Sequence, residues 1–147
     1  MPIQHEGASG RAPSPFSSTG PRRHPWFLRW LPVLLWMAAV FTLSSLPMPE
    51  LPEAPNIPHA DKIAHGVAYA VGGLLVARAA ANPLVAVLVP AIFGVTDEWH
   101  QKSVPGRQSD LADWIADLLG TLAGVLIYRW IRARRAAAID PTWRPNA

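Results

Sequence analysis

The segment DLADWIADLLGTLAGVLIYRWI, residues 110–131, does most to determine the expected fold. Small residues recur at every fourth position of this segment: Ala112, Ala116, Gly120 and Gly124. This spacing puts them on one side of an α-helix, where they form a smooth stripe that lets a second helix approach closely. The apolar segment 62–81 offers a similar set of small residues: Gly66, Ala70, Gly72 and Gly73. The alternative is that both sets merely reflect an alanine-rich composition.

Four apolar segments predict an all-α integral membrane bundle of four transmembrane helices. The segments lie at about residues 28–46, 62–81, 83–99 and 110–131. Half of the 147 residues are hydrophobic and only 16% are charged, against about 25% charged residues in soluble domains. A cleaved signal peptide is the alternative for the first segment, but Ser44-Ser45-Leu46-Pro47 lacks a small-x-small cleavage pattern.

The basic residues predict how the bundle is oriented. Eight arginines fall on one side of it: Arg22, Arg23, Arg29, Arg78, Arg129, Arg132, Arg134 and Arg135. Only Lys62, Lys102 and Arg107 fall on the other side. The positive-inside rule then places the N-terminus and the C-terminus in the cytoplasm of a multi-pass cell-membrane protein. We expect a disordered cytoplasmic tail over residues 1–24, a transmembrane domain over 25–135 and a flexible tail over 136–147.

Composition excludes several functional classes. Cysteine is absent, so there is no disulfide, thiolate metal site or cysteine nucleophile. The formal net charge of +3 comes from basic residues that flank the apolar segments, without a basic stripe interleaved with aromatic residues. We therefore expect no nucleic-acid partner, and the first partner expected is the membrane lipid bilayer.

Polar residues that are unusual in so apolar a chain fall at the predicted outer face. The candidate polar site comprises Asp61, His65, Asp97, Glu98, His100, Gln101, Arg107, Asp113 and Asp117. Antiparallel helices bring these positions together. Asp117 lies well inside its helix, where a charged carboxylate facing lipid costs on the order of 2 kcal/mol or more. We expect Asp117 to face the bundle interior, to be protonated or to bind a partner.

The turn before the last segment carries a separate set of expectations. Pro105-Gly106-Arg107 predicts a turn, and Ser109 or Asp110 is placed to cap the following helix. Arg107 is expected either to neutralise the carboxylates or to bind a phosphate or carboxylate ligand.

Three roles stay open for the polar site. Its histidines and carboxylates are donors that a divalent cation accepts, although HExxH and other tight ligand spacings are absent. A histidine beside carboxylates also suits general acid and base chemistry, without an obvious nucleophile. The third role is a polar lock for helix register or a non-catalytic binding site. The residues alone assign no catalytic group, metal ligand or cofactor.

Three ordered motifs resemble the VanZ-like membrane protein family. They are Asp61-Lys62-x-x-His65-x-x-x-Tyr69, Thr96-Asp97-Glu98-x-His100-Gln101, and Val104-Pro105-Gly106-Arg107 followed by Asp113 and Gly120. The resemblance covers residues 28–131, and its specific part is 61–124. The family commonly has Asn four positions after the fourth-helix Asp, where this chain has Asp117.

The resemblance implies a small multi-spanning protein of the bacterial inner membrane. The family's namesake is associated with resistance to the glycopeptide antibiotic teicoplanin. We therefore expect a cell-envelope protein linked to antibiotic resistance, which binds or shields a cell-wall or lipid-linked ligand at its outer polar site. One alternative is a membrane enzyme, metal-assisted or not, that acts on a lipid-linked or cell-wall precursor. The other alternative is a scaffold for another envelope protein.

Overall fold

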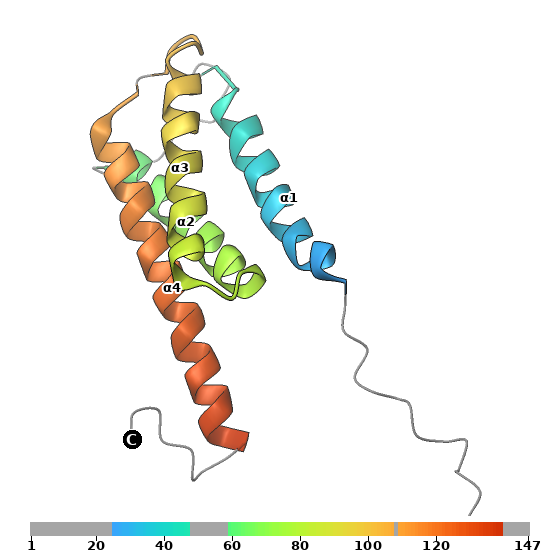
Figure 1. Ribbon diagram of the computed structural model, residues 1–147. Coiled ribbons are helices and arrows are strands. Elements are labelled where there is room, and N and C mark those ends of the chain that lie inside the picture. The colour runs from blue at the N-terminus through green and yellow to red at the C-terminus, as the bar shows by residue number, and fades with distance from the viewer. Residues whose placement is uncertain (1–24, 48–58, 108, 140–147) are drawn as a thin grey trace, which may run out of the picture.

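The computed structural model describes residues 25–47, 59–107 and 109–139, and these residues form four α-helices and no strand (Figure 1). The helices are α1 (Trp26–Ser44), α2 (Ala60–Ala79), α3 (Pro83–Gln101) and α4 (Leu111–Ile139). The all-α class and the number of helices are confirmed. The ends of the first three helices differ from the predicted ones by at most two residues. Residues 1–24 and 140–147, predicted as tails, lie outside the described ranges.

Helix α4 is longer than predicted. It continues to Ile139, although the expected span ended at residue 131. The extension is rich in alanine and arginine, which are strong helix formers that need no apolar environment. The prediction followed the apolar run, which ends before the helix does. Residues 136–139, expected in the flexible tail, are therefore helical.

Local side-chain caps fix the starts of two helices. The Oδ1 atom of Asn82 accepts a hydrogen bond of 2.8 Å from the Leu84 main-chain N–H, directly before α3. Asp110 caps α4, because its Oδ1 atom accepts a hydrogen bond of 3.0 Å from the Ala112 N–H. The predicted turn before α4 is also present, with Gly106 at a φ of 77° that glycine adopts readily.

The four helices alternate in direction, so that both termini of the bundle lie at one end (Figure 1). Helix α2 packs against all three other helices and has its largest interface with α4. In the part of the chain that is described, α1 packs against α2 and α3 but not against α4. The start of α2, the end of α3 and the start of α4 thus meet at the opposite end, which we call the polar end.

Glycines set the close approach of α2 and α4. The Cα of Gly120 faces the main-chain carbonyl of Gly66, and Gly124 faces that of Ala70, without room for a side chain. The predicted small-residue stripe is therefore an interface. Gly72 differs from this expectation, since it faces the indole of Trp36 on α1.

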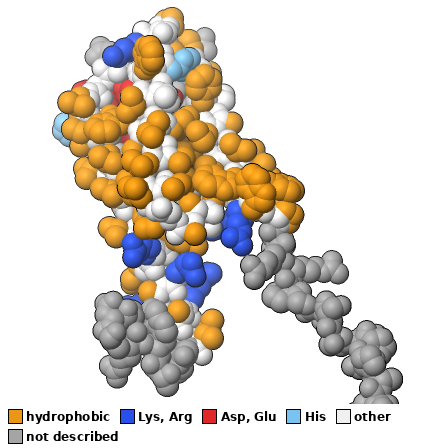
Figure 2. Space-filling view, in the orientation of Figure 1, with side chains coloured by type: hydrophobic (Ala, Val, Ile, Leu, Met, Phe, Trp, Pro, Cys, Tyr) orange, Lys and Arg blue, Asp and Glu red, His pale blue; other side chains and the backbone are white. Residues whose placement is uncertain are grey.

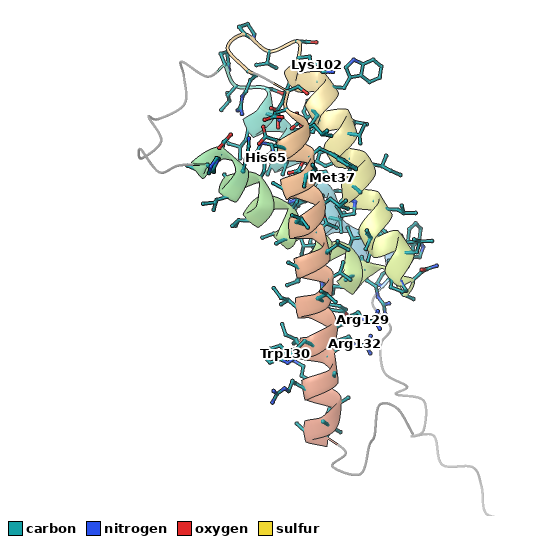
Figure 3. All side chains as sticks on the ribbon, turned by 90° about the vertical axis from the view of Figure 1, so that its left-hand side faces the viewer. Met37, His65, Lys102, Arg129, Trp130 and Arg132 are labelled. Atoms are coloured by element: carbon teal, nitrogen blue, oxygen red, sulfur yellow. The ribbon has the colours of Figure 1, made fainter. Side chains whose placement is uncertain are left out.

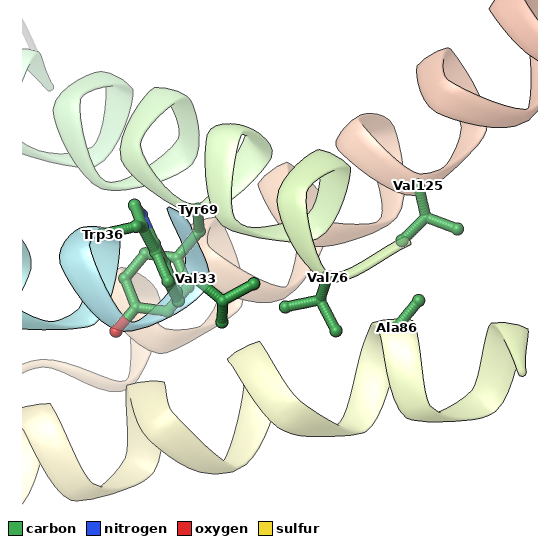
Figure 4. Close-up of a cluster of buried hydrophobic side chains, with 6 residues drawn as sticks. All are labelled: Val33, Trp36, Tyr69, Val76, Ala86 and Val125. Atoms are coloured by element: carbon green, nitrogen blue, oxygen red, sulfur yellow. The ribbon is translucent and has the colours of Figure 1, made fainter. Parts of the chain in front are cut away.

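The apolar core is small and lies in the middle of the bundle. Its buried members are Val33, Trp36, Tyr69, Val76, Ala86 and Val125 (Figure 4). The ring of Trp36 meets that of Tyr69 edge-on at 5.4 Å, and its Nε1–H donates a hydrogen bond of 2.9 Å to the carbonyl of Ala68. This indole therefore anchors α1 to α2.

Large apolar side chains cover the outside of all four helices. Leu35, Val67, Ile92 and Leu126, one from each helix, are exposed over most of their surface, and Figure 2 shows a mostly hydrophobic face. Among the described helices, α1 and α4 are long and apolar enough to cross a membrane by themselves. Helices α2 and α3 carry charged residues at their polar ends and do not reach that level. Large exposed apolar surface is rare on soluble monomers and suits a lipid environment.

Arginines gather at the end opposite the polar end. Arg29, Arg78 and Arg132, from three different helices, line one groove together with Leu28 and Tyr128. Figure 2 shows most of the visible Lys and Arg side chains at this end, and Figure 3 places Arg129 and Arg132 there. The structure thus separates a basic end from the polar end.

The glycine contact predicts different effects for the same substitution on the two facing helices. Gly120→Ala puts a Cβ against the Gly66 carbonyl and should lower the free energy of unfolding by about 1–3 kcal/mol. Gly66→Ala is the matched control, because its Cβ would lie 3.7 Å from the Ala116 carbonyl, an ordinary contact. Thermal unfolding of both variants in detergent measures the difference. Equal unfolding midpoints would contradict a close α2–α4 crossing.

Candidate functional site

Seven of the nine predicted site residues fall into two groups at the polar end, which also contain residues that were not predicted; Asp61 and Arg107 lie outside both groups. The first, which we call the α1–α3 tether, comprises Ser44, Ser45, Asp97, His100 and Gln101. The second, which we call the carboxylate cluster, comprises Lys62, His65, Glu98, Asp113 and Asp117. Figure 3 labels His65 at this end of the molecule and shows oxygen atoms gathered beside it.

Asp97 is the centre of the α1–α3 tether and is only 2% exposed. Its Oδ2 atom accepts hydrogen bonds from Ser44 Oγ at 2.7 Å and from Gln101 Nε2 at 3.0 Å. Asp97 and Gln101 lie four residues apart on α3 and therefore share a helix face. Because Ser44 ends α1, the contact fixes α1 against the last turn of α3.

His100 completes the tether rather than joining the carboxylate cluster. Its imidazole stacks on the ring of Phe41 with centroids 4.5 Å apart, and its Nε2 atom lies 3.0 Å from Ser45 Oγ. Both partners belong to the end of α1. The imidazole therefore holds two helices together.

Arg107 contacts main-chain carbonyls and not the carboxylates. Its guanidinium donates to the carbonyl of Leu43 at 2.7 Å and to that of Leu46 at 3.3 Å. The last carbonyls of a helix have no partner within the helix and carry partial negative charge, so a cation is stabilised there. The expectation that Arg107 neutralises the carboxylates is thus not met, since it caps α1.

Lys62 neutralises the outer part of the carboxylate cluster. Its Nζ atom lies 2.9 Å from Asp113 Oδ1, 3.0 Å from Asp61 Oδ2 and 3.4 Å from Asp110 Oδ2. Asp113 is buried, whereas Asp61 and Asp110 are exposed. Asp61 therefore lies at the rim and pairs with Lys62, and it has no hydrogen bond with His65 among the described residues.

Asp117 is fully buried and contacts His65 across the α2–α4 interface. Its Oδ1 atom lies 2.9 Å from His65 Nδ1. A carboxylate can only accept, so the imidazole donates through its Nδ1–H. The Oδ2 atom has no partner within the described ranges and lies on the side where α3 has only Gly94. Of the three expectations for Asp117, the structure shows the interior position, together with a contact to His65.

Glu98 is buried, and neither of its carboxylate oxygens has a hydrogen-bond partner among the described residues. Tyr69 Oη and Thr121 Oγ1 are also buried without a partner in the same part of the chain. Most buried polar atoms in proteins are paired. So many unpaired atoms in one region indicate a place for a polar ligand, ion or water.

One set of donors has the spacing of a metal site. Ligand atoms of His65, Glu98 and Asp113 all lie within 4.8 Å of one another. They come from α2, α3 and α4, so three helices converge on this point. No cofactor beyond a metal ion is suggested by the residues in the described ranges.

A groove of about 600 Å³ opens beside the cluster between α3 and α4, and Glu98 reaches it from the interior. Its polar and aromatic lining comprises Glu98, Trp99, Lys102, Ser109, Asp110 and Trp114. The main-chain N–H of Ala112 donates to Asp110 and, with Lys62 nearby, keeps the pKa of Asp110 below its usual value. The groove therefore has a charged carboxylate at its rim.

Four residues in or beside the site were missed by the sequence interpretation: Lys62, Tyr69, Ser44 and Ser45. Lys62 and Tyr69 stood inside the family motif but were not assigned to the site. Ser44 was considered only as part of a cleavage pattern. A lysine next to Asp61 and two hydroxyl residues at the end of the first apolar segment were the available signals.

The tether predicts a stability difference between two hydroxyl residues of α1. Ser44→Ala removes a hydrogen bond to a buried carboxylate and should lower the free energy of unfolding by about 1.5–3 kcal/mol. Thr42→Val is the control, because this exposed hydroxyl donates only to Ala38 of its own helix, and should change stability by less than about 0.5 kcal/mol. Denaturation in detergent compares the two variants, and equal losses would contradict the tether.

Comparison with known proteins agrees with the motifs. The family model described as VanZ/LLP1 matches residues 29–132, which run from Arg29 of α1 through α2 and α3 to Arg132 of α4. No curated protein and no solved structure gives a significant match. A match over this length, which contains every residue of the candidate site, shows the family: the chain belongs to the VanZ-like family.

Proposed function

We propose that this VanZ-like protein crosses the bacterial cytoplasmic membrane four times and binds an envelope component in the groove at its polar end, on the outer face. The groove is the observation that carries the proposal. It combines the exposed ring of Trp99 with the exposed carboxylate of Asp110 at its rim. Its volume of about 600 Å³ lies within the range of small-molecule pockets.

The membrane position is supported by the exposed apolar side chains of α2 and α3. Both helices carry leucine, isoleucine or valine on their outer surface, although each has charged residues at the polar end. Those charged residues lie where a membrane-spanning helix would meet the lipid headgroups. The basic end, with Arg29, Arg78 and Arg132, then belongs in the cytoplasm by the positive-inside rule.

The chemistry of the ligand follows from which charged side chains at the polar end already have a partner within the protein. Arg107 donates to carbonyls of α1, and Lys62 is surrounded by three carboxylates. Neither of these two cations is positioned in the groove to bind a phosphate, and Lys102, which does line the groove, shares that lining with the carboxylate of Asp110. Carboxylates and tryptophan rings instead recognise an ammonium group or a hydrogen-bond donor on an apolar frame. Cell-wall peptides and glycopeptide antibiotics carry such groups.

The topology can be tested with single cysteines, because the natural chain has none. Ser103→Cys lies at the polar end and Ala138→Cys at the end of α4, and both positions are exposed. In intact cells, a membrane-impermeant maleimide should label Ser103→Cys. It should label Ala138→Cys only after the membrane is opened. The reverse pattern would place the groove in the cytoplasm and end the proposal.

The role of the groove in glycopeptide susceptibility can be tested by substituting two tryptophans of equal exposure. Expression of the wild-type chain in a teicoplanin-susceptible host should raise the inhibitory concentration several-fold. Trp99→Ala removes an aromatic ring from the groove and should abolish this increase. Trp26→Ala is the matched control, since Trp26 and Trp99 are both 75% exposed and Trp26 lies at the other end of the bundle.

Immunoblots of membrane fractions must show equal amounts of the three proteins in this experiment. Unchanged susceptibility with the wild-type chain would reject the link to glycopeptides. Equal effects of both substitutions would reject the groove as the binding site.

A further inference from the structure

Three helices bring one imidazole and two carboxylates to a single point inside the polar end. His65 of α2, Glu98 of α3 and Asp113 of α4 each place a ligand atom within 4.8 Å of the other two. Atoms bound at opposite sides of a divalent cation are separated by roughly 4–5 Å, given metal–ligand distances of about 2.0–2.4 Å. The observed spacing is thus compatible with a common ion after small side-chain rotations.

Glu98 gives independent evidence that something binds there. Its residue surface is only 7% exposed, and neither carboxylate oxygen has a hydrogen-bond partner among the described residues. The neighbouring Asp97, 2% exposed, receives two hydrogen bonds from the tether on its Oδ2 atom. An isolated buried carboxylate costs several kcal/mol in effective terms, so it requires a cation, a hydrogen-bond donor or a proton.

Asp117 holds His65 in the manner of a metal-bound histidine. The Nδ1–H of His65 donates to Asp117 Oδ1 at 2.9 Å, which leaves the lone pair on Nε2 for coordination. A carboxylate behind a ligating histidine fixes its tautomer and raises its basicity. Asp117 is 0% exposed, so its carboxylate is shielded from solvent, whereas the His65 side chain is 18% exposed.

The charge balance also favours a cation. Glu98, Asp113 and Asp117 are buried within the same region, and Lys62 contacts only Asp113 among them. Because Lys62 pairs with Asp113, the carboxylates of Glu98 and Asp117 have no cationic partner in the described ranges unless His65 is protonated. A divalent ion supplies two positive charges at the point where the carboxylates converge.

From this geometry we infer that His65, Glu98 and Asp113 bind one divalent cation, with Asp117 orienting His65. One nitrogen and two oxygen donors suit Zn²⁺ or Mn²⁺ better than the all-oxygen sites of Ca²⁺ and Mg²⁺. Three protein ligands leave a coordination position open, and Glu98 borders the groove through which an ion can enter. The inference goes beyond the proposed function and does not depend on it.

Elemental analysis of the purified full-length chain is the first test. Protein prepared in chelator-free detergent buffer should contain about one Zn²⁺ or Mn²⁺ per chain. After treatment with EDTA, ZnCl₂ or MnCl₂ should rebind in calorimetric titration and raise the thermal midpoint. A cation content equal to that of a buffer blank, with no binding of either salt, would overturn the inference.

Variants separate the cation ligands from neighbouring carboxylates. Glu98→Gln keeps the shape of the side chain, removes its charge and should weaken binding of the probe metal by more than about 100-fold. Asp61→Asn is the control, because this carboxylate is exposed and contacts only Lys62, and should bind as wild type does. Equal affinity of Glu98→Gln and wild type would exclude Glu98 as a ligand.

Asp117 gives a test of the orienting role. Asp117→Asn retains an oxygen that accepts from His65 and should bind the cation about 10- to 100-fold more weakly than wild type. Asp117→Ala should weaken binding further. If Glu98→Gln fails to accumulate, the cation content of wild type and the Asp117→Asn titration still decide the question. Antibiotic susceptibility is a separate readout, so loss of the cation and loss of the proposed function are distinguishable.

Discussion

The close crossing of α2 and α4 is the contact on which the rest of the structure depends. Apolar burial gives little drive for helix association inside a lipid bilayer, because lipid tails are as apolar as leucine side chains. Close backbones supply that drive through van der Waals contact, and Gly120 and Gly124 permit it by facing the carbonyls of Gly66 and Ala70. The same crossing sets which polar groups meet. His65 lies one residue before Gly66, and its partner Asp117 lies three residues before Gly120, so the glycine register places the imidazole against the carboxylate.

In a membrane environment apolar side chains face the lipid outside and polar side chains gather inside the bundle. Each buried carboxylate there needs a structural or functional explanation. Asp97 and Glu98 are adjacent in sequence and similarly buried, yet about 100° of helix rotation directs them to different neighbours. Asp97 turns toward α1, where two hydrogen bonds receive it. Glu98 turns toward α2 and α4, where His65 and Asp113 are close and the Ser109 hydroxyl lies nearby, but its oxygens form no well-aligned hydrogen bond in the described part of the chain. The first carboxylate is explained by architecture, and the second is not.

Much of the fold could be predicted from the sequence, and less of the site. Apolar segment lengths predict four helices, and four-residue periodicity predicts the face of α4 that contacts α2, because both depend only on the geometry of a single helix. Contacts between helices depend also on their crossing angle and register. The sequence therefore suggested that Asp61 and His65 act together, whereas Lys62 holds Asp61 at the rim. The sequence likewise offered two kinds of partner for Arg107, namely the carboxylates or an anionic ligand. It could not show that the Arg107 guanidinium lies within hydrogen-bond distance of the carbonyls of Leu43 and Leu46.

The two groups at the polar end are mechanically connected, although their side chains do not share a hydrogen bond. Helix α1 does not pack against α4 in the described ranges, so its place beside the site depends on α2, on the tether and on Arg107. The tether contacts α3 through Asp97 and Gln101, and Glu98 lies between them on the same turn. Asp97 thus links Ser44 of α1 to the turn of α3 that carries Glu98, while Arg107 holds the end of α1 through its carbonyls.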